Sequence, residues 1–194
     1  MQNSDVYLFF DTETTGLPKN WKAPVSDTNN WPRIVQIAWI LSSQENGRIE
    51  SNDYIIKPEG YEIPEESSRV HGISTQKAHA EGVDLLEVLN KFNLVMQKSS
   101  CLVAHNMNFD EKVLGAEFLR KGIENDFFEK RRLCTMEKST QYCKLPGRYG
   151  YKWPSLSELH NILFGEDFED AHNAAGDINA TERCFWKLRE IGLF

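Results

Sequence analysis

The sequence has few cysteines and no long apolar run. Its four cysteines form no C-x-x-C pair and are too sparse for a disulfide framework in a chain of 194 residues, which predicts reduced thiols and an intracellular protein. The apolar run nearest the N-terminus covers only residues 6–10, and no basic segment precedes it. The sequence therefore predicts neither a signal peptide nor a membrane span, and we expect a cytoplasmic protein without membrane contact.

Positive charge is also scarce. The 22 basic side chains are outnumbered by 29 acidic ones, and the net charge of −7 has the wrong sign for coating nucleic acid through bulk electrostatics. Any nucleic-acid role therefore needs a local binding site whose charge differs from that of the whole chain. Hydrophobic residues make up 40% of the chain, which is enough for a core, and no repeat, low-complexity tract or linker interrupts it. We expect one domain over residues 1–194.

The hydrophobic pattern predicts an α/β domain. Apolar runs predict strands at residues 6–10, 34–41, 49–57, 101–104 and near 133, with the first three as antiparallel neighbours. Helical spacing predicts helices at residues 84–97, at residues 110–120, between a Ser155 capping box and Gly165, and from about 174 to 188. This order of elements predicts a mixed β-sheet flanked by helices.

Two carboxylates end the first predicted strand. Asp11 and Glu13 stand two residues apart, so strand alternation directs both to one face of the sheet. Such neighbours repel one another unless a cation lies between them, and hard oxygen ligands are those that Mg²⁺ and Mn²⁺ prefer. Ordinary strand-to-turn chemistry is the alternative for this pair taken alone.

Two further segments carry acidic residues near the starts of predicted helices. Asp110 follows a buried strand and begins a helix, where it could also be a simple N-cap. Asp177 lies in the first turns of the last helix, and His172, five residues earlier, would reach the same place from the leading edge of that helix. A structural role is open for each of them alone. Three such segments in one short domain predict a shared site.

These segments resemble the motifs of one enzyme family. Residues 10–17 (FDTETTGL), residues 104–110 (AHNMNFD) and the H-x-A-x-x-D run at residues 172–177 resemble the DEDDh family of 3′→5′ exonucleases, which includes ribonuclease T, oligoribonuclease and the exonuclease domain of the DNA polymerase III epsilon subunit. The resemblance covers nearly the whole chain. Asn173 stands where the sister group has tyrosine, which favours the histidine class. The resemblance implies a ribonuclease H-like exonuclease fold.

The resemblance also implies a reaction. Two divalent cations, Mg²⁺ or Mn²⁺, would be held by four carboxylates, and His172 would deprotonate the attacking water. The four carboxylates are Asp11, Glu13, Asp110 and Asp177.

A substrate pocket is implied in the same way. Thr14 and Leu17 would receive the terminal 3′ nucleotide. Further candidates to line the pocket are His71, His105, Asn106 and Phe109, for which a role as loop or core residues stays open.

Two segments combine aromatic and basic residues. Residues 138–157 contain no acid, and their lysines, arginine, tyrosines and tryptophan suit the binding of single strands, although the rings could instead pack on the body of the protein. An insert at residues 19–33 repeats this mixture after the first motif. It would form a flap beside the site or pack on the sheet.

The leading prediction is an exonuclease acting on single-stranded 3′ ends. We expect DNA rather than RNA, because the first motif and the His71-Gly72 segment look like the proofreading branch. Alternatives are an exoribonuclease of the ribonuclease T or oligoribonuclease type, a ribonuclease H-type endonuclease and a non-catalytic nucleic-acid-binding relative. The sequence ends directly after the last predicted helix, where the epsilon subunit continues into a polymerase-binding tail. We therefore expect a stand-alone nuclease, with a polymerase or repair protein as partner left open.

Overall fold

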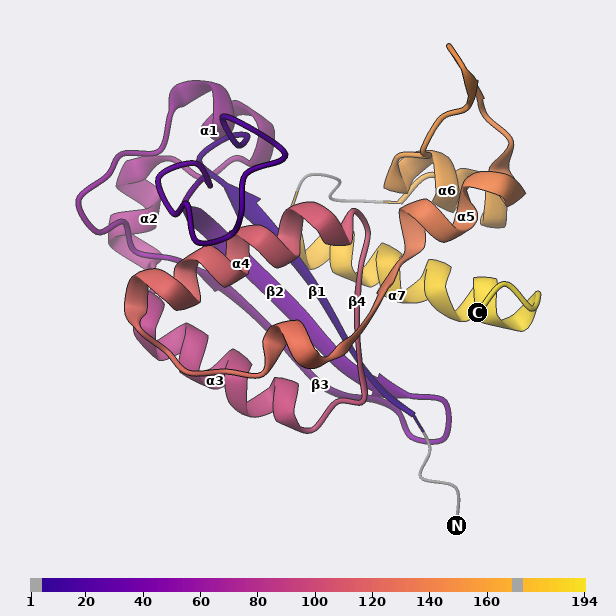
Figure 1. Cartoon of the computed structure of the whole chain (residues 1–194), viewed down its shortest axis with the longest axis horizontal. Helices are drawn as coiled ribbons and strands as arrows, with labels where there is room; N and C mark the ends of the chain where they lie inside the picture. The colour runs from indigo at the N-terminus through magenta and orange to yellow at the C-terminus, as the bar shows by residue number, and fades with distance from the viewer. Residues whose placement is uncertain (1–4, 169–172) are drawn as a thin grey trace.

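A five-stranded mixed sheet forms the centre of the fold (Figure 1). The computed structural model describes residues 5–168 and 173–194. Antiparallel ladders join the first three strands, and parallel ladders join β1 to β4 and β4 to β5, in the order β3-β2-β1-β4-β5. The predicted mixed sheet is therefore confirmed. The strands are β1 (Val6–Thr14), β2 (Ile34–Ser43), β3 (Gly47–Ile55), β4 (Cys101–Ala104) and β5 (Arg131–Cys134).

Each face of the sheet is covered by helices. Leu8 and Phe10 of β1 belong to the core that packs under α3 (Leu85–Gln97) and α4 (Met107–Lys121). Tyr7 and Phe9 point to the opposite face, where they pack with Ile178 and Phe185 of α7 (Ala174–Glu190). In Figure 1, α3 and α4 lie in front of the sheet and α7 lies behind it. This alternation fixes where the next residues of β1 point.

β1 is longer than the sequence predicts. It continues past Phe10 to Thr14 because β2 pairs with it along its whole length, whereas its pairing with β4 ends at Phe9 and Val103. One edge of β1 is therefore free of a strand from Phe10 onward. By alternation, Asp11 and Glu13 belong to the α7 face and Thr12 to the α4 face.

Several elements differ from the predictions. The sequence pattern missed α1 (Glu65–His71), α2 (Thr75–Glu81), α5 (Thr135–Cys143) and a hairpin of β6 (Pro146–Gly147) and β7 (Gly150–Tyr151). The third strand lies two residues earlier than predicted, and α4 begins three residues earlier. The predicted capping box is confirmed: Ser155 and Glu158 cap each other at the start of α6 (Leu156–Phe164). None of the described helices is long and apolar enough to cross a membrane.

Candidate active site

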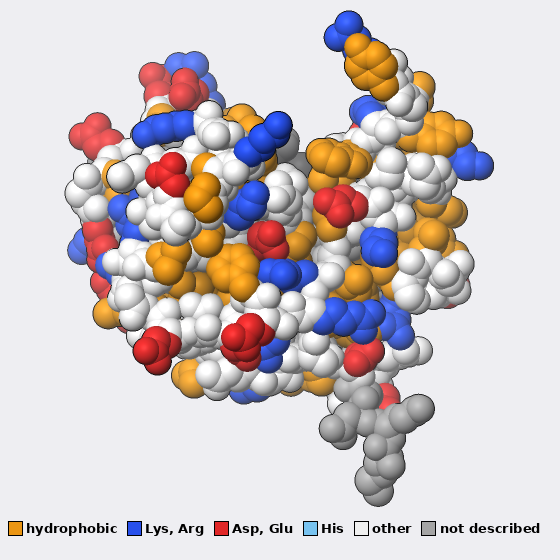
Figure 2. Space-filling view, in the orientation of Figure 1, with side chains coloured by type: hydrophobic (Ala, Val, Ile, Leu, Met, Phe, Trp, Pro, Cys, Tyr) orange, Lys and Arg blue, Asp and Glu red, His pale blue; other side chains and the backbone are white. Residues whose placement is uncertain are grey.

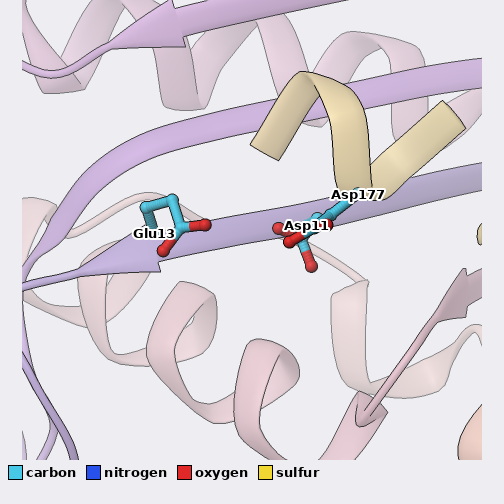
Figure 3. A group of neighbouring side chains, drawn as sticks. All are labelled: Asp11, Glu13 and Asp177. Atoms are coloured by element: carbon cyan, nitrogen blue, oxygen red, sulfur yellow. The ribbon is translucent and has the colours of Figure 1, made fainter. Parts of the chain in front are cut away.

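Three carboxylates meet where β1 passes the first turn of α7. Oxygen atoms of Asp11, Glu13 and Asp177 all lie within 4.8 Å of one another. Asp11 and Glu13 share a face of β1, and Asp177 projects from α7 onto that face (Figure 3). The predicted convergence of the first and third motifs is therefore present in the structure, and its oxygen donors are those that a divalent cation takes.

The start of α7 is fixed beside these carboxylates by β2. Gln36, the register partner of Glu13, accepts the backbone N–H of Ala174 at 3.3 Å and donates to Asp53 at 2.8 Å. Asn173 caps the helix by accepting the N–H of Ala175 at 3.0 Å. The sequence motifs do not mark Gln36, because its role depends on the pairing of β1 with β2.

Asp110 reaches the site from the other side of β1. It lies in the first turn of α4, whose N-cap is Asn106, so Asp110 is not the N-cap that the sequence left open. Its Oδ1 accepts both the backbone N–H of Thr12 at 3.2 Å and the Thr12 hydroxyl at 2.7 Å. Because β4 stops short of this point, a side chain takes the place of a strand at the edge of β1.

Burial and neighbouring carboxylates raise the pKa values of Asp11, Glu13 and Asp110. Burial, followed by the charges of Asp110, Asp177 and Glu13, raises the pKa of Asp11 well above its usual range. Burial and the charges of Asp177 and Asp110 raise the pKa of Glu13 to about 8. The pKa of Asp110 rises to about 7 because burial outweighs its two hydrogen bonds from Thr12. Asp110 is thus electrostatically part of the site, although it lies outside the group of three oxygens within 4.8 Å.

A cavity of about 570 Å³ opens beside Glu13, between the end of β1 and α1. Four of the predicted substrate residues line it: Thr14, Leu17, His71 and Phe109. Leu17 is 74% exposed at its rim, and Gly16 beside it has φ +143°, a conformation that favours glycine. The cavity and the carboxylate cluster share Glu13.

His71 is held in the cavity wall by a sharp break between two helices. Gly72 ends α1 in the left-handed conformation at φ 73°, and Ser74 caps α2 by accepting the N–H of Lys77 at 3.1 Å. The Nδ1 atom of His71 accepts the N–H of Ile73 at 3.2 Å, which places the proton of the neutral ring on Nε2. Burial lowers the pKa of His71, and the nearby Thr14 backbone partly offsets that effect.

The other two substrate candidates lie elsewhere. His105 and Asn106 are not among the residues that line the cavity. His105 bridges two parts of the chain through Nδ1 to the Thr135 hydroxyl at 2.9 Å and Nε2 to the Pro154 carbonyl at 3.1 Å, and burial lowers its pKa to about 4. Asn106 begins α4 with φ 83°. The geometry fits both as supports of the loop that presents Asp110.

The insert after the first motif packs on α4. Buried Glu117 of α4 accepts the Nε–H of Arg33 at 2.8 Å and the N–H of Ile34 at 3.2 Å, and Arg120 Nη1 lies 3.0 Å from the same oxygen. Trp21 of the insert contacts Phe109 of the cavity wall, with ring centroids 5.7 Å apart. The insert therefore lies against α4, with Ala23 and Trp31 in the core under the sheet and Trp21 beside Phe109 of the cavity wall. His172, the predicted base, lies outside the described residues.

Comparisons with known proteins decide the family. The family model described as "Exonuclease" matches residues 8–185, which is most of the chain. The chain belongs to the exonuclease family. This match and the fold confirm the predicted resemblance to DEDDh-type 3′→5′ exonucleases of the ribonuclease H-like superfamily, whereas the particular likeness to the epsilon subunit stays a prediction. No match to the sequence is found among curated proteins.

Solved structures with the same fold include E. coli exonuclease I. Its complex with a dA16 oligonucleotide has a TM-score of 0.75 and 20% identity over 96% of this chain and 41% of that one. The zinc-bound form of its complex with single-stranded DNA also has a TM-score of 0.75, at 22% identity over 98% of this chain. The present chain thus spans about 42% of the length of exonuclease I.

Proposed function

We propose that this chain is a metal-dependent 3′→5′ exonuclease that hydrolyses single-stranded DNA from its 3′ end and releases nucleoside 5′-monophosphates. The observation that carries this proposal is Glu13, which belongs both to the carboxylate cluster and to the wall of the cavity. A terminal nucleotide held in the cavity would bring its phosphodiester bond against the carboxylates. The family membership of the chain supports the same reaction class.

The residues fit two divalent cations, Mg²⁺ or Mn²⁺. Asp11, Glu13 and Asp177 would hold them, with Asp110 completing the set. Burial first, and the charges of neighbouring carboxylates second, raise the pKa values of Asp11, Glu13 and Asp110, and bound cations would offset both effects. When bound, such ions supply an activated water and stabilise the leaving 3′-oxygen.

The remaining roles fall to uncharged or basic groups. We assign His172 as the base that takes the proton of the attacking water. Thr14, Leu17, His71 and Phe109 would receive the terminal nucleotide, since they line the cavity. Thr12 orients Asp110 through its two hydrogen bonds. No residue of this set needs to form a covalent intermediate.

DNA as the substrate is supported by fold relatives. Structures of E. coli exonuclease I contain dA16 and dT13 oligonucleotides, and they share the fold of this chain. A cytoplasmic location belongs to the same proposal, because the four free cysteines would stay reduced there. A partnership with a polymerase or repair protein stays a prediction.

Matched 5′-labelled single-stranded DNA and RNA test the proposed activity. With Mg²⁺ or Mn²⁺, we expect DNA to shorten one nucleotide at a time from the 3′ end, and a chelator to stop the reaction. Faster shortening of RNA would favour the exoribonuclease alternative. Internal cuts, or no cleavage with either metal, would contradict the proposal.

The pH dependence of the rate tests His172. With metal bound, we expect kcat to rise as the histidine loses its proton, near its ordinary pKa of about 6.5. A His172→Ala variant should lose most of the activity, while His79→Ala, on exposed α2 surface, should keep it. A wild-type profile that is flat from about pH 5.5 to 8 would count against His172 as the base.

A further inference from the structure

The most exposed aromatic side chains lie on one projecting hairpin. Residues 144–153, here called the arm, connect α5 to α6 and contain β6 and β7. Tyr149 is 89% exposed, Trp153 63% and Tyr151 48%. Figure 2 shows the arm reaching beyond the rest of the surface, with a basic and an aromatic side chain at its tip. Tyr149 and Trp153 are therefore mostly free of the body of the protein, whereas Tyr151 is about half buried, so the alternative of packed rings fails for two of the three.

The arm has a defined conformation despite its exposure. β6 and β7 pair through Pro146–Tyr151 and Gly147–Gly150, and the N–H of Lys152 donates to the carbonyl of Leu145 at 2.9 Å. The two residues between β6 and β7, Arg148 and Tyr149, form the turn. The Arg148 guanidinium lies 5.1 Å from the centre of the Tyr149 ring. Short hairpins of this size are marginal alone, so the base of the arm has to be held by the rest of the fold.

The base of the arm is attached to the active-site loop. Pro154, directly after the arm, accepts a hydrogen bond from His105, which follows β4 and stands five residues before Asp110. The low pKa of about 4 keeps the His105 ring neutral, so it can accept from Thr135 through Nδ1 and donate to Pro154 through Nε2. The arm is thus hydrogen-bonded to the short connection between β4 and α4, and Asp110 lies in the first turn of the helix that follows this connection.

The charge of the arm is opposite to that of the whole chain. Lys144, Arg148 and Lys152 are its only charged residues, whereas the net charge of the chain is −7. Lys152 pairs with Glu158, but Lys144 and Arg148 form no ion pair within the described residues. Exposed rings beside unpaired cations suit a ligand that offers both flat apolar faces and negative charge, as an unpaired nucleic-acid strand does.

We propose that the arm binds the single strand upstream of the terminal nucleotide, with bases stacked on Tyr149 and Trp153 and phosphates beside Lys144 and Arg148. The proposal rests on the proposed exonuclease function, which places the 3′ end near Glu13. In Figure 2, the upper edge of the molecule is indented beside the part that carries the arm. Figure 1, in the same orientation, shows α5 and α6 on that side and α1 on the other. A strand leaving the cavity would cross this indentation to the arm.

Binding of fluorescent oligodeoxythymidylates of 3 and 12 nucleotides, measured in chelator by anisotropy, tests the arm without turnover. Stacking contributes about 1–3 kcal/mol per base, so the double variant Tyr149→Ala/Trp153→Ala should bind the 12-mer about 10-fold or more weakly. Its affinity for the 3-mer should change less than about 2-fold, because the proposal places only the bases upstream of the terminal nucleotides on the arm. Arg148→Ala should reduce the salt dependence of 12-mer binding by about one counterion. Leu94→Ala, an exposed apolar residue on α3, is the matched control.

Two outcomes would overturn the proposal. In the first, the double variant binds the 12-mer as tightly as the wild type does. A wild-type dimer in sedimentation that the double variant loses, without loss of 12-mer binding, would assign the arm to a second copy of the chain instead. Hydrolysis of the 3-mer by the wild type with Mg²⁺ tests the proposed function separately, because that substrate does not depend on the arm.

Discussion

Thr12 lies between two carboxylates of the site and donates a hydrogen bond to a third, Asp110. It is buried, its neighbours Asp11 and Glu13 point to the α7 face, and its own hydroxyl points to Asp110 on α4. A hydrogen bond donated to a carboxylate favours the ionised form, which is the form that binds a cation. The hydroxyl therefore opposes the effect of burial on Asp110.

A Thr12→Val substitution tests this effect, because it keeps the volume and the backbone N–H. Without the hydroxyl, the pKa of Asp110 should rise further above about 7, and Mn²⁺ at neutral pH should bind about 10- to 100-fold more weakly. Calorimetric titration at two pH values would show the difference shrinking as the solution becomes more alkaline. Thr140→Val on α5 removes a hydroxyl that only bonds Met136 and is the control. An unchanged affinity would contradict the assigned role.

Asp177 should be needed for activity and not for folding. Its charge raises the pKa values of Asp11, Glu13 and Asp110, so Asp177→Asn relieves repulsion in the metal-free protein. We expect the exonuclease rate to fall more than about 100-fold and the metal-free Tm to stay equal or rise. Glu45→Gln, in the turn at the opposite end of β1 and β2, should change neither. A markedly lower Tm of Asp177→Asn in chelator would give this carboxylate a structural role.

At the scale of elements, the insert before β2 depends on one buried carboxylate. Glu117 is fully buried and meets two arginines, Arg33 at the end of the insert and Arg120 on α4. Arg120 in turn donates to the carbonyls of Thr28 and Trp31. Loss of the Glu117 charge leaves two cations without their shared partner and loosens the segment that carries Trp21.

Glu117→Gln should therefore affect both stability and substrate binding. We expect a loss of about 2–4 kcal/mol in the free energy of unfolding, measured in urea, because a buried ion pair loses one partner. The KM for a short oligonucleotide should rise, since Trp21 supports Phe109 in the cavity wall. Glu87→Gln, which breaks an exposed pair with Lys91, should cost less than about 0.5 kcal/mol. Equal losses in the two variants would refute the anchoring role.

The elements that the sequence predicted are those with a strong apolar period. β1, β2, α3 and α7 bury long apolar stripes, so periodicity reveals them. α1 and α2 were missed because each has seven residues and buries only one or two, mostly polar, side chains. Their signals are local instead: Gly72 as a left-handed cap and Ser74 as an N-cap.

The sequence predicted the part of the candidate site that its motifs supply, and not the contacts between segments that hold it. The period of β1 and the first turn of the last helix predicted that Asp11, Glu13 and Asp177 converge, and they do. The bonds of His105 to Thr135 and Pro154 join residues 30 and 49 positions apart and leave no local pattern. Asn106 and Phe109 are only three residues apart, so the sequence could not tell that Phe109 lines the cavity and Asn106 does not.

At the scale of the whole molecule, the site should make stability depend on pH. Glu13 and Asp110 have folded-state pKa values of about 8 and 7, above their values in the unfolded chain. Between the unfolded and the folded pKa of each group, the folded protein therefore holds more protons than the unfolded chain. Stability is then lost as the pH rises through the folded values. The neutral His105 acts in the opposite sense, but only below about pH 6.5.

The metal-free Tm should therefore fall between about pH 6.5 and 8.5. Mn²⁺ at a fixed concentration of about 100 times its dissociation constant at neutral pH should restore about 2.7 kcal/mol at that pH. The gain in Tm at this concentration should be larger at the alkaline end, where the ligands are ionised and bind Mn²⁺ more tightly. Thermal scans with chelator and with Mn²⁺ measure both effects. Asp177→Asn should flatten the metal-free curve. A Tm that rises with pH across this window in chelator would contradict the coupling of these carboxyls.

The distance in sequence between the clustered carboxylates has a consequence during synthesis. Asp11 and Glu13 leave the ribosome before Asp177, which follows Asp11 by 166 residues and comes from α7. A nascent chain that lacks α7 carries two of the three clustered carboxylates and an uncovered face of the sheet. The proposed cation site is therefore complete only once α7 has docked, and nuclease activity would report that α7 has packed on the sheet.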